Sequence, residues 1–180
     1  MRASDHSPVE APPEPLPVPS AEVSATGRSG RIEAAFAAFA AMLREGGFAV
    51  PAQGWSAELV AAHVVLNNEE FTRVAEALAR GEQPAYDNAP AVDERALHDL
   101  VARAGGLPGL ADEVERSAAR LIAARGALTD EQAARAVHLR IRHDGRIIRD
   151  APGPIGEWIE GNASFHLRQH AEQLAALRGR

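Results

Sequence analysis

Two histidines in the C-terminal region, His166 and His170, are spaced four residues apart in a stretch with helical periodicity. Residues at positions i and i+4 of an α-helix project from the same face, so both imidazoles could bind one metal ion. His63 is the only other histidine on an apolar helical stripe, and a facing helix could supply it as a third ligand. Three neutral imidazoles with a water molecule in the fourth place would form an open, catalytic-type metal site.

Two simpler explanations compete with a metal site. A pair of histidines four residues apart often arises by chance, and a single histidine such as His63 is more often a hydrogen-bonded core residue. The metal site is favoured because the expected inward stripe of the last helix is apolar at both ends but polar in the middle: Ile155, Ile159, Asn162, His166, His170, Gln173 and Leu177. Burying those polar side chains is costly unless something satisfies them.

Several polar residues near the three histidines could support such a site. We expect Asn67, Asn162 and Gln173 to orient the imidazole rings by hydrogen bonding to the ring nitrogens that do not bind the metal. Glu70 is the one nearby carboxylate that could act as a general base, which a metal-dependent hydrolase would require. The spacing of these residues does not decide between a hydrolase and other chemistry.

The periodicity of apolar residues predicts a mainly all-α domain, a four-helix bundle. Its long helices would extend from Ser29 to Gly46, from Ser56 to about Arg80, from Pro108 to about residue 128, and from Pro154 to the C-terminus. Shorter helical segments are expected at 93–104 and after Thr129, where Thr129 and Gln132 have the spacing of a capping box. Asp144-Gly145 between two alternating segments predicts a small β-hairpin before the last helix.

The first 27 residues differ from the rest of the chain, because they are rich in proline and contain few large apolar side chains. Such a segment cannot bury enough surface to offset the entropy lost on ordering, which predicts a disordered tail over 1–27. Residues 28–180 are then expected to form a single domain.

The hairpin is rich in arginine. A two-residue loop at Asp144-Gly145 would place Arg140 opposite Arg149 and put Arg142 on the same face. Like charges directly across two strands are unfavourable unless solvent or an anion screens them. This face is therefore either a solvated surface or a binding site for the carboxylate of a small-molecule cofactor or substrate.

Composition excludes several classes of function. The chain has no cysteine, which rules out disulfides, cysteine-ligated zinc or iron–sulfur sites, and a thiol nucleophile carried by the protein. The net charge is −6 and no arginine-rich cluster with aromatics occurs, so nucleic acid is not an expected partner. No apolar run is long enough for a membrane helix, and the N-terminus lacks the features of a signal peptide. We expect a cytoplasmic protein, and the use of arginine without lysine suggests a GC-rich bacterial genome.

Two motifs in this order resemble the DinB-like superfamily, which includes the metal-binding domain of mycothiol-dependent maleylpyruvate isomerases. The motifs are Gly54-Trp55-Ser56-Ala57-Glu58-Leu59 followed by Ala62-His63, and His166-x-x-x-His170-x-x-Gln173-Leu174. The resemblance covers about residues 28–180. It implies a four-helix bundle with a long crossover connection. It also implies a divalent metal, zinc or nickel, held by His63, His166 and His170.

The resemblance further implies transferase or isomerase chemistry with a low-molecular-weight thiol, such as mycothiol or bacillithiol, and an electrophilic substrate. A metal-coordinated thiol loses its proton near neutral pH and becomes a nucleophile. Because the sequence ends soon after the second motif, a transferase is favoured over the two-domain isomerases. A homodimer is also expected. The alternatives are a non-catalytic metal-binding, oligomerisation or regulatory bundle, and a metal-dependent hydrolase.

Overall fold

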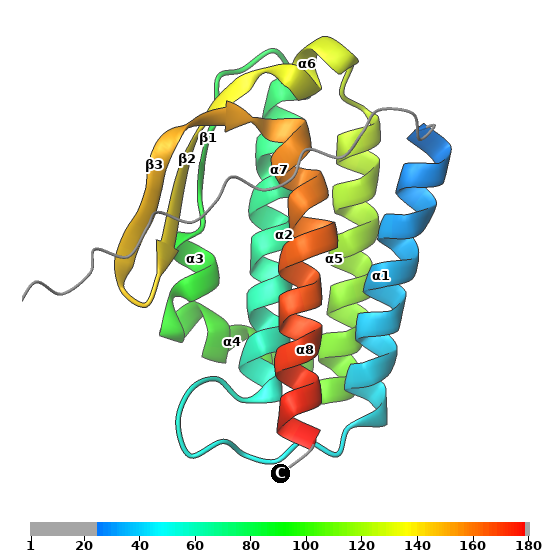
Figure 1. Cartoon of the computed structure of the whole chain (residues 1–180), viewed down its shortest axis with the longest axis vertical. Helices are drawn as coiled ribbons and strands as arrows, with labels where there is room; N and C mark the ends of the chain where they lie inside the picture. Colours follow the sequence, from blue (N-terminus) through cyan, green and yellow to red (C-terminus); the bar gives the residue numbers. More distant parts are fainter. Residues whose placement is uncertain (1–24, 179–180) are drawn as a thin grey trace, which may run out of the picture.

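Four long helical columns form the body of the computed structural model, which describes residues 25–178 (Figure 1). They are α1 (Ala25–Glu45), α2 (Ala57–Ala79), α5 (Leu107–Gly126) and a C-terminal column of α7 (Ile155–Gly161), η1 (Asn162–His166) and α8 (Leu167–Arg178). Since α2 and α5 run in the same direction, the chain between them must cross back along the bundle. This crossover contains β1 (Ala85–Asp87), α3 (Ala89–Val92) and α4 (Glu94–Ala104). The predicted mainly helical bundle with a long crossover is confirmed.

Capping residues explain where several helices begin. The Ser56 side chain accepts a hydrogen bond from the Leu59 amide at the start of α2. Thr129 and Gln132 form the predicted capping box at α6 (Asp130–Ala134). Both arrangements satisfy amide groups that a helix leaves without partners at its first turn. Helix α1 begins at Ala25, inside the predicted tail of 1–27, and the rest of that tail lies outside the described residues.

A three-stranded sheet lies against one side of the bundle (Figure 1). Strands β2 (Ala136–His143) and β3 (Arg146–Pro154) form the predicted antiparallel hairpin. Asp144 and Gly145 both have positive φ angles, 46° and 72°, as a tight two-residue hairpin turn requires. Sequence reasoning missed β1, which pairs in parallel with β2. Three residues are too few to show an alternating pattern.

The predicted pairing of the two hairpin strands is wrong beyond the first two residue pairs. Arg142 lies opposite Ile147, but Ile141 lies opposite Arg149, so Ile148 is an extra residue on β3. This β-bulge shifts the register by one residue. Arg140 consequently faces Asp150 rather than another arginine, and the like-charge pair inferred from the sequence does not form.

The apolar core is divided into two clusters by a layer of buried polar side chains. The lower cluster in Figure 1 joins α1, α4, α8 and the first halves of α2 and α5, with Leu43 and Leu174 fully buried. The upper cluster joins the sheet, α7 and the second halves of α2 and α5, with Leu78 and Ile159 at most 2% exposed. Between them lie Asn67, Asn68, Ser117 and Asn162. The three histidines are on the helices that carry this layer.

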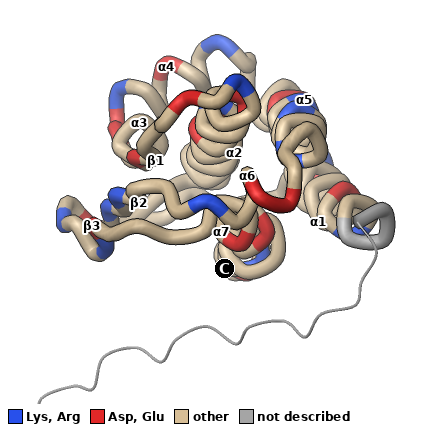
Figure 2. Tube along the Cα trace, turned by 90° about the horizontal axis from the view of Figure 1, so that it is seen from above, with Lys and Arg blue, Asp and Glu red and all other residues tan. Residues whose placement is uncertain are grey.

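Charged residues of both signs are distributed along the helices and along the hairpin (Figure 2). In the part of the chain that the structure describes, no helix is long and apolar enough to cross a membrane.

Gly109 allows the first turn of α5 to pack against the end of α4. A Cβ atom at this position would lie 1.9 Å from the carbonyl oxygen of Ala104, which is backbone and cannot move aside freely. We expect Gly109→Ala to lower the free energy of unfolding by about 2 kcal/mol, as overpacking does. Gly126→Ala is the matched control in the same helix, because a Cβ there meets nothing within 4 Å. Urea denaturation of both variants measures the difference, and equal stabilities would contradict this packing.

Candidate metal centre

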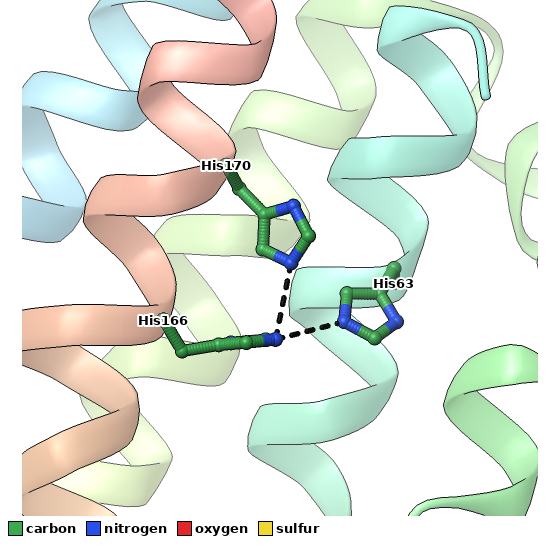
Figure 3. Close-up of side chains that lie close together, drawn as sticks. All are labelled: His63, His166 and His170. Atoms are coloured by element: carbon green, nitrogen blue, oxygen red, sulfur yellow. Dashed lines mark hydrogen bonds between the residues drawn. The ribbon is translucent and has the colours of Figure 1, made fainter. Parts of the chain in front are cut away.

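The structure brings His63, His166 and His170 together between α2 and the C-terminal column (Figure 3). The Nε2 atom of His166 lies 3.0 Å from the Nε2 atom of His63 and 3.0 Å from that of His170. The potential ligand atoms of all three side chains lie within 4.8 Å of one another. Residues more than 100 positions apart in the sequence therefore direct nitrogen atoms at one point.

Hydrogen bonds made by Nδ1, the ring nitrogen that faces away from the cluster, fix the orientation and tautomer of two of the three imidazoles. The Nδ1–H of His63 donates to the carbonyl oxygen of Ala91 in α3, at 2.6 Å. The Nδ1–H of His170 donates to Oε1 of Gln173, one turn further along α8, at 3.0 Å. A neutral imidazole protonated on Nδ1 carries a lone pair on Nε2. Both lone pairs consequently face the Nε2 atom of His166.

The cluster has too few N–H groups for both short Nε2–Nε2 contacts to be hydrogen bonds. His166 Nε2 carries at most one hydrogen, so it can donate to His63 or to His170 but not to both with good geometry. At least one buried lone pair is left facing another nitrogen. A cation that accepts electron pairs from all three Nε2 atoms removes this mismatch. Three nitrogens bound to one ion at about 2.0–2.1 Å lie about 3.3 Å apart, close to the two short separations observed here. The donor set therefore fits a divalent transition metal.

Burial keeps the three imidazoles neutral, which is the form that binds metal. The pKa of His63 falls to about 4, chiefly because the ring is buried and secondly because His170 is near. Burial likewise lowers the pKa of His166 to about 3, with His170 and His63 adding to the effect. The pKa of His170 is also lowered by burial. At neutral pH no proton has to be displaced from the Nε2 lone pairs of His63 and His170.

A π-helical turn determines how deeply the two C-terminal histidines lie in the bundle. Sequence reasoning expected one uninterrupted helix, but η1 closes with a hydrogen bond from the Leu167 amide to the Asn162 carbonyl, five residues back. The extra residue rotates the following helix by about 100° relative to an uninterrupted one. Leu167 and Leu174 become the buried positions, while His166 and His170 are half-buried. The π turn thus moves the histidines from the centre of the core to its edge.

The residues expected to orient the rings have different positions in the structure. Gln173 contacts His170, as described above. Asn67 and Asn162 instead bond to each other, with the Asn67 amide donating to Oδ1 of Asn162 at 2.6 Å. Sequence reasoning missed their further partners Asn68, Tyr86 and Ser117, and also the Ala91 carbonyl. The adjacent pair Asn67-Asn68 on an apolar stripe was the available signal for the polar layer. A backbone acceptor such as Ala91 leaves no signal in the sequence.

Glu70 lies apart from the histidine cluster. Its carboxylate accepts two hydrogen bonds from Arg73, at 2.6 and 2.9 Å, and one from the Asp87 amide at 3.3 Å. These contacts hold Glu70 against β1, and the cluster of potential metal ligands in the described chain comprises the three histidines without it. The structure gives no support to Glu70 as a general base.

The three hairpin arginines all have partners within the protein. Arg142 makes two hydrogen bonds to the Asp87 carboxylate, at 3.0 and 3.1 Å, and Arg140 lies 3.2 Å from Asp150. Arg149 donates to the Pro152 carbonyl and lies over the ring of Trp158, 4.8 Å from its centroid. An anion would have to compete with these contacts, and binding of an anion here remains a prediction.

Comparison with known proteins bears on the fold. No protein-family model matches the chain, and no curated protein matches its sequence. Among solved structures, the chain is similar to the crystal structure of the mycothiol-dependent maleylpyruvate isomerase, with a TM-score of 0.62 and 18% sequence identity. The match covers 84% of this chain and 61% of the isomerase chain, so this chain corresponds to less than two thirds of that protein. The chain therefore shares the fold of that isomerase, and in this chain three histidines converge between the helices of that fold.

Proposed function

We propose that the chain binds a divalent metal ion, zinc or nickel, through the Nε2 atoms of His63, His166 and His170. We further propose that the site activates a low-molecular-weight thiol for transfer or isomerisation chemistry. The observation that carries the metal proposal is the convergence of three Nε2 atoms, two of them with lone pairs fixed by the partners of their Nδ1–H groups. Such carbonyl partners on the outer nitrogen are typical of metal-ligating histidines.

A bound divalent ion would supply Lewis acidity, lowering the pKa of a thiol or water molecule that reaches it. The chain itself supplies orientation and shielding. Ala91 and Gln173 hold the His63 and His170 rings, and Trp55 packs beside His63 with the ring centroids 5.0 Å apart. His166 and His170 are half-buried rather than fully buried, which supports access of a small molecule to the edge of the cluster.

The thiol proposal is supported by the fold and by the composition. The solved isomerase with a similar fold is described as mycothiol-dependent. This chain has no cysteine, so any sulfur nucleophile has to come from a small molecule. A second substrate of electrophilic character is then required. A hydrolase is less well supported, because Glu70 is engaged by Arg73 rather than directed at the histidines.

Thiol binding can be measured on protein loaded with cobalt(II), whose absorption spectrum reports its ligands. We expect mycothiol to produce a sulfur-to-metal charge-transfer band, because a thiolate can enter an open position beside three imidazoles. Bacillithiol and glutathione test the specificity, and S-methylated mycothiol is the matched control because it cannot form a thiolate. Cobalt-loaded protein that shows no such band with any thiol at millimolar concentration would contradict the thiol proposal without contradicting the metal site.

A further inference from the structure

A continuous chain of hydrogen bonds runs through the polar layer between the two apolar clusters. The Tyr86 hydroxyl donates to Oδ1 of Asn67, and the Asn67 amide donates to Oδ1 of Asn162 at 2.6 Å. The Asn162 amide donates to Oδ1 of Asn68 at 3.0 Å, and the Asn68 amide donates to the Ser117 hydroxyl at 3.2 Å. These side chains come from β1, α2, η1 and α5, so the chain links four elements across the core.

All donors in this chain point in the same direction along it. The last link is the Ser117 hydroxyl, which donates to the Val114 carbonyl at 3.0 Å. Each amide both accepts from the preceding residue and donates to the next, and all five residues are at most 6% exposed. A buried polar chain that is fully satisfied favours one arrangement of its elements, because any displacement leaves a buried group without a partner.

The chain meets the histidine site at Asn162. The carbonyl of Asn162 accepts the π-type hydrogen bond from the Leu167 amide, while its side chain is tied to Asn67 and Asn68 on α2. His63 lies one turn before Asn67 on α2, and His166 lies one turn after Asn162. The amide of Asn162 therefore connects the backbone that carries His166 and His170 to the helix that carries His63.

We propose that Asn162 is a positioning residue. It holds the π turn in place through Asn67 and Asn68 and thereby sets His166 and His170 against His63. Neither Asn162 nor Asn67 has to touch an imidazole for this role. Without the two side-chain bonds, the π-type hydrogen bond from the Leu167 amide to the Asn162 carbonyl opens more readily, and α8 can then rotate and displace both histidines. The proposal rests on the proposed metal site for its effect on binding, whereas the effect on the π turn is independent of any metal.

The test compares Asn162→Leu, which keeps the side-chain size but cannot hydrogen bond, with Thr72→Val. Thr72 is a matched control because it is buried on α2 and donates to the Asn68 carbonyl without contacting the π turn. We expect Asn162→Leu to weaken zinc binding by about 10- to 100-fold, the range found for residues that orient metal ligands. It should also change the cobalt(II) absorption spectrum and increase hydrogen exchange at the Leu167 amide. Thr72→Val should leave all three unchanged, even where both variants lose similar stability.

If Asn162→Leu does not fold, Tyr86→Phe tests the first link of the chain while keeping the stacking of this ring on Phe71. We then expect zinc binding to weaken by about fivefold, corresponding to one neutral hydrogen bond, with faster exchange at Leu167. A folded Asn162→Leu variant with the affinity, spectrum and Leu167 exchange of Thr72→Val would overturn the proposal. If the native protein binds no zinc, the proposed function fails, and unchanged Leu167 exchange in Asn162→Leu would separately overturn the role of Asn162.

Discussion

Replacing His166 with alanine is expected to abolish stoichiometric metal binding while the bundle remains folded. His166 is the central ligand candidate, because its Nε2 atom lies 3.0 Å from both other Nε2 atoms. Its loss leaves two imidazoles, which bind a divalent ion far more weakly than three in one site. We expect a loss of affinity well beyond the roughly 100-fold caused by residues that only orient ligands. Competition with a chromophoric chelator measures the dissociation constant.

The matched control is His98→Ala. His98 is exposed on α4 and does not belong to the cluster, so its removal takes away one histidine without touching the site. We expect native affinity in this variant and similar losses in His63→Ala and His170→Ala. Equal affinities for His166→Ala and His98→Ala would show that metal in the protein is bound elsewhere.

The metal-free protein is expected to lose stability steeply as the pH falls below 6.5. The unfolded chain takes up protons on its histidines near pH 6.5, whereas the folded chain holds His63 neutral down to about pH 4 and His166 neutral down to about pH 3. Between these values the unfolded state binds more protons, so the free energy of unfolding decreases with decreasing pH. Each of these histidines contributes about 1.4 kcal/mol per pH unit, and the two together contribute about 3 kcal/mol per pH unit between pH 5.5 and 4.5.

Urea denaturation in the presence of a chelator measures this dependence. In His166→Ala the slope should fall by about 1.4 kcal/mol per pH unit, while His98→Ala should keep the slope of the native protein. The comparison between variants is needed because carboxylates with lowered pKa values, such as Asp87 and Asp150, also lose their favourable contacts in acid. Parallel pH profiles for the native protein and His166→Ala would mean that His166 has the same pKa in the folded and unfolded states.

The meeting of the three histidines was predictable because helical periodicity fixes which residues share a face. His166 and His170 are four residues apart, and His63 lies on the apolar face of α2, so packing two amphipathic helices brings the three together. The capping box at Thr129 and the tight turn at Asp144-Gly145 were predictable for a related reason, since both depend on residues that are near in sequence.

The features that were not predictable depend on contacts between distant segments. The π turn at Asn162 has no local signature, because the side-chain bonds to Asn67 and Asn68 come from a helix almost 100 residues earlier. The β-bulge at Ile148 reversed the inference about Arg140, because one extra residue moves every later side chain to a new partner. Helix α3, which supplies the carbonyl that orients His63, is only four residues long.

Metal analysis combined with X-ray absorption on the native protein tests the existence of the metal centre most directly. Protein purified from medium supplemented with zinc and nickel should contain about one metal ion per chain, bound by three imidazole nitrogens at about 2.0–2.1 Å. The metal should be removable with a chelator and should rebind to the folded protein in the same stoichiometry. A folded protein that remains metal-free and takes up neither ion at millimolar concentration would contradict the assignment of His63, His166 and His170 as a metal centre.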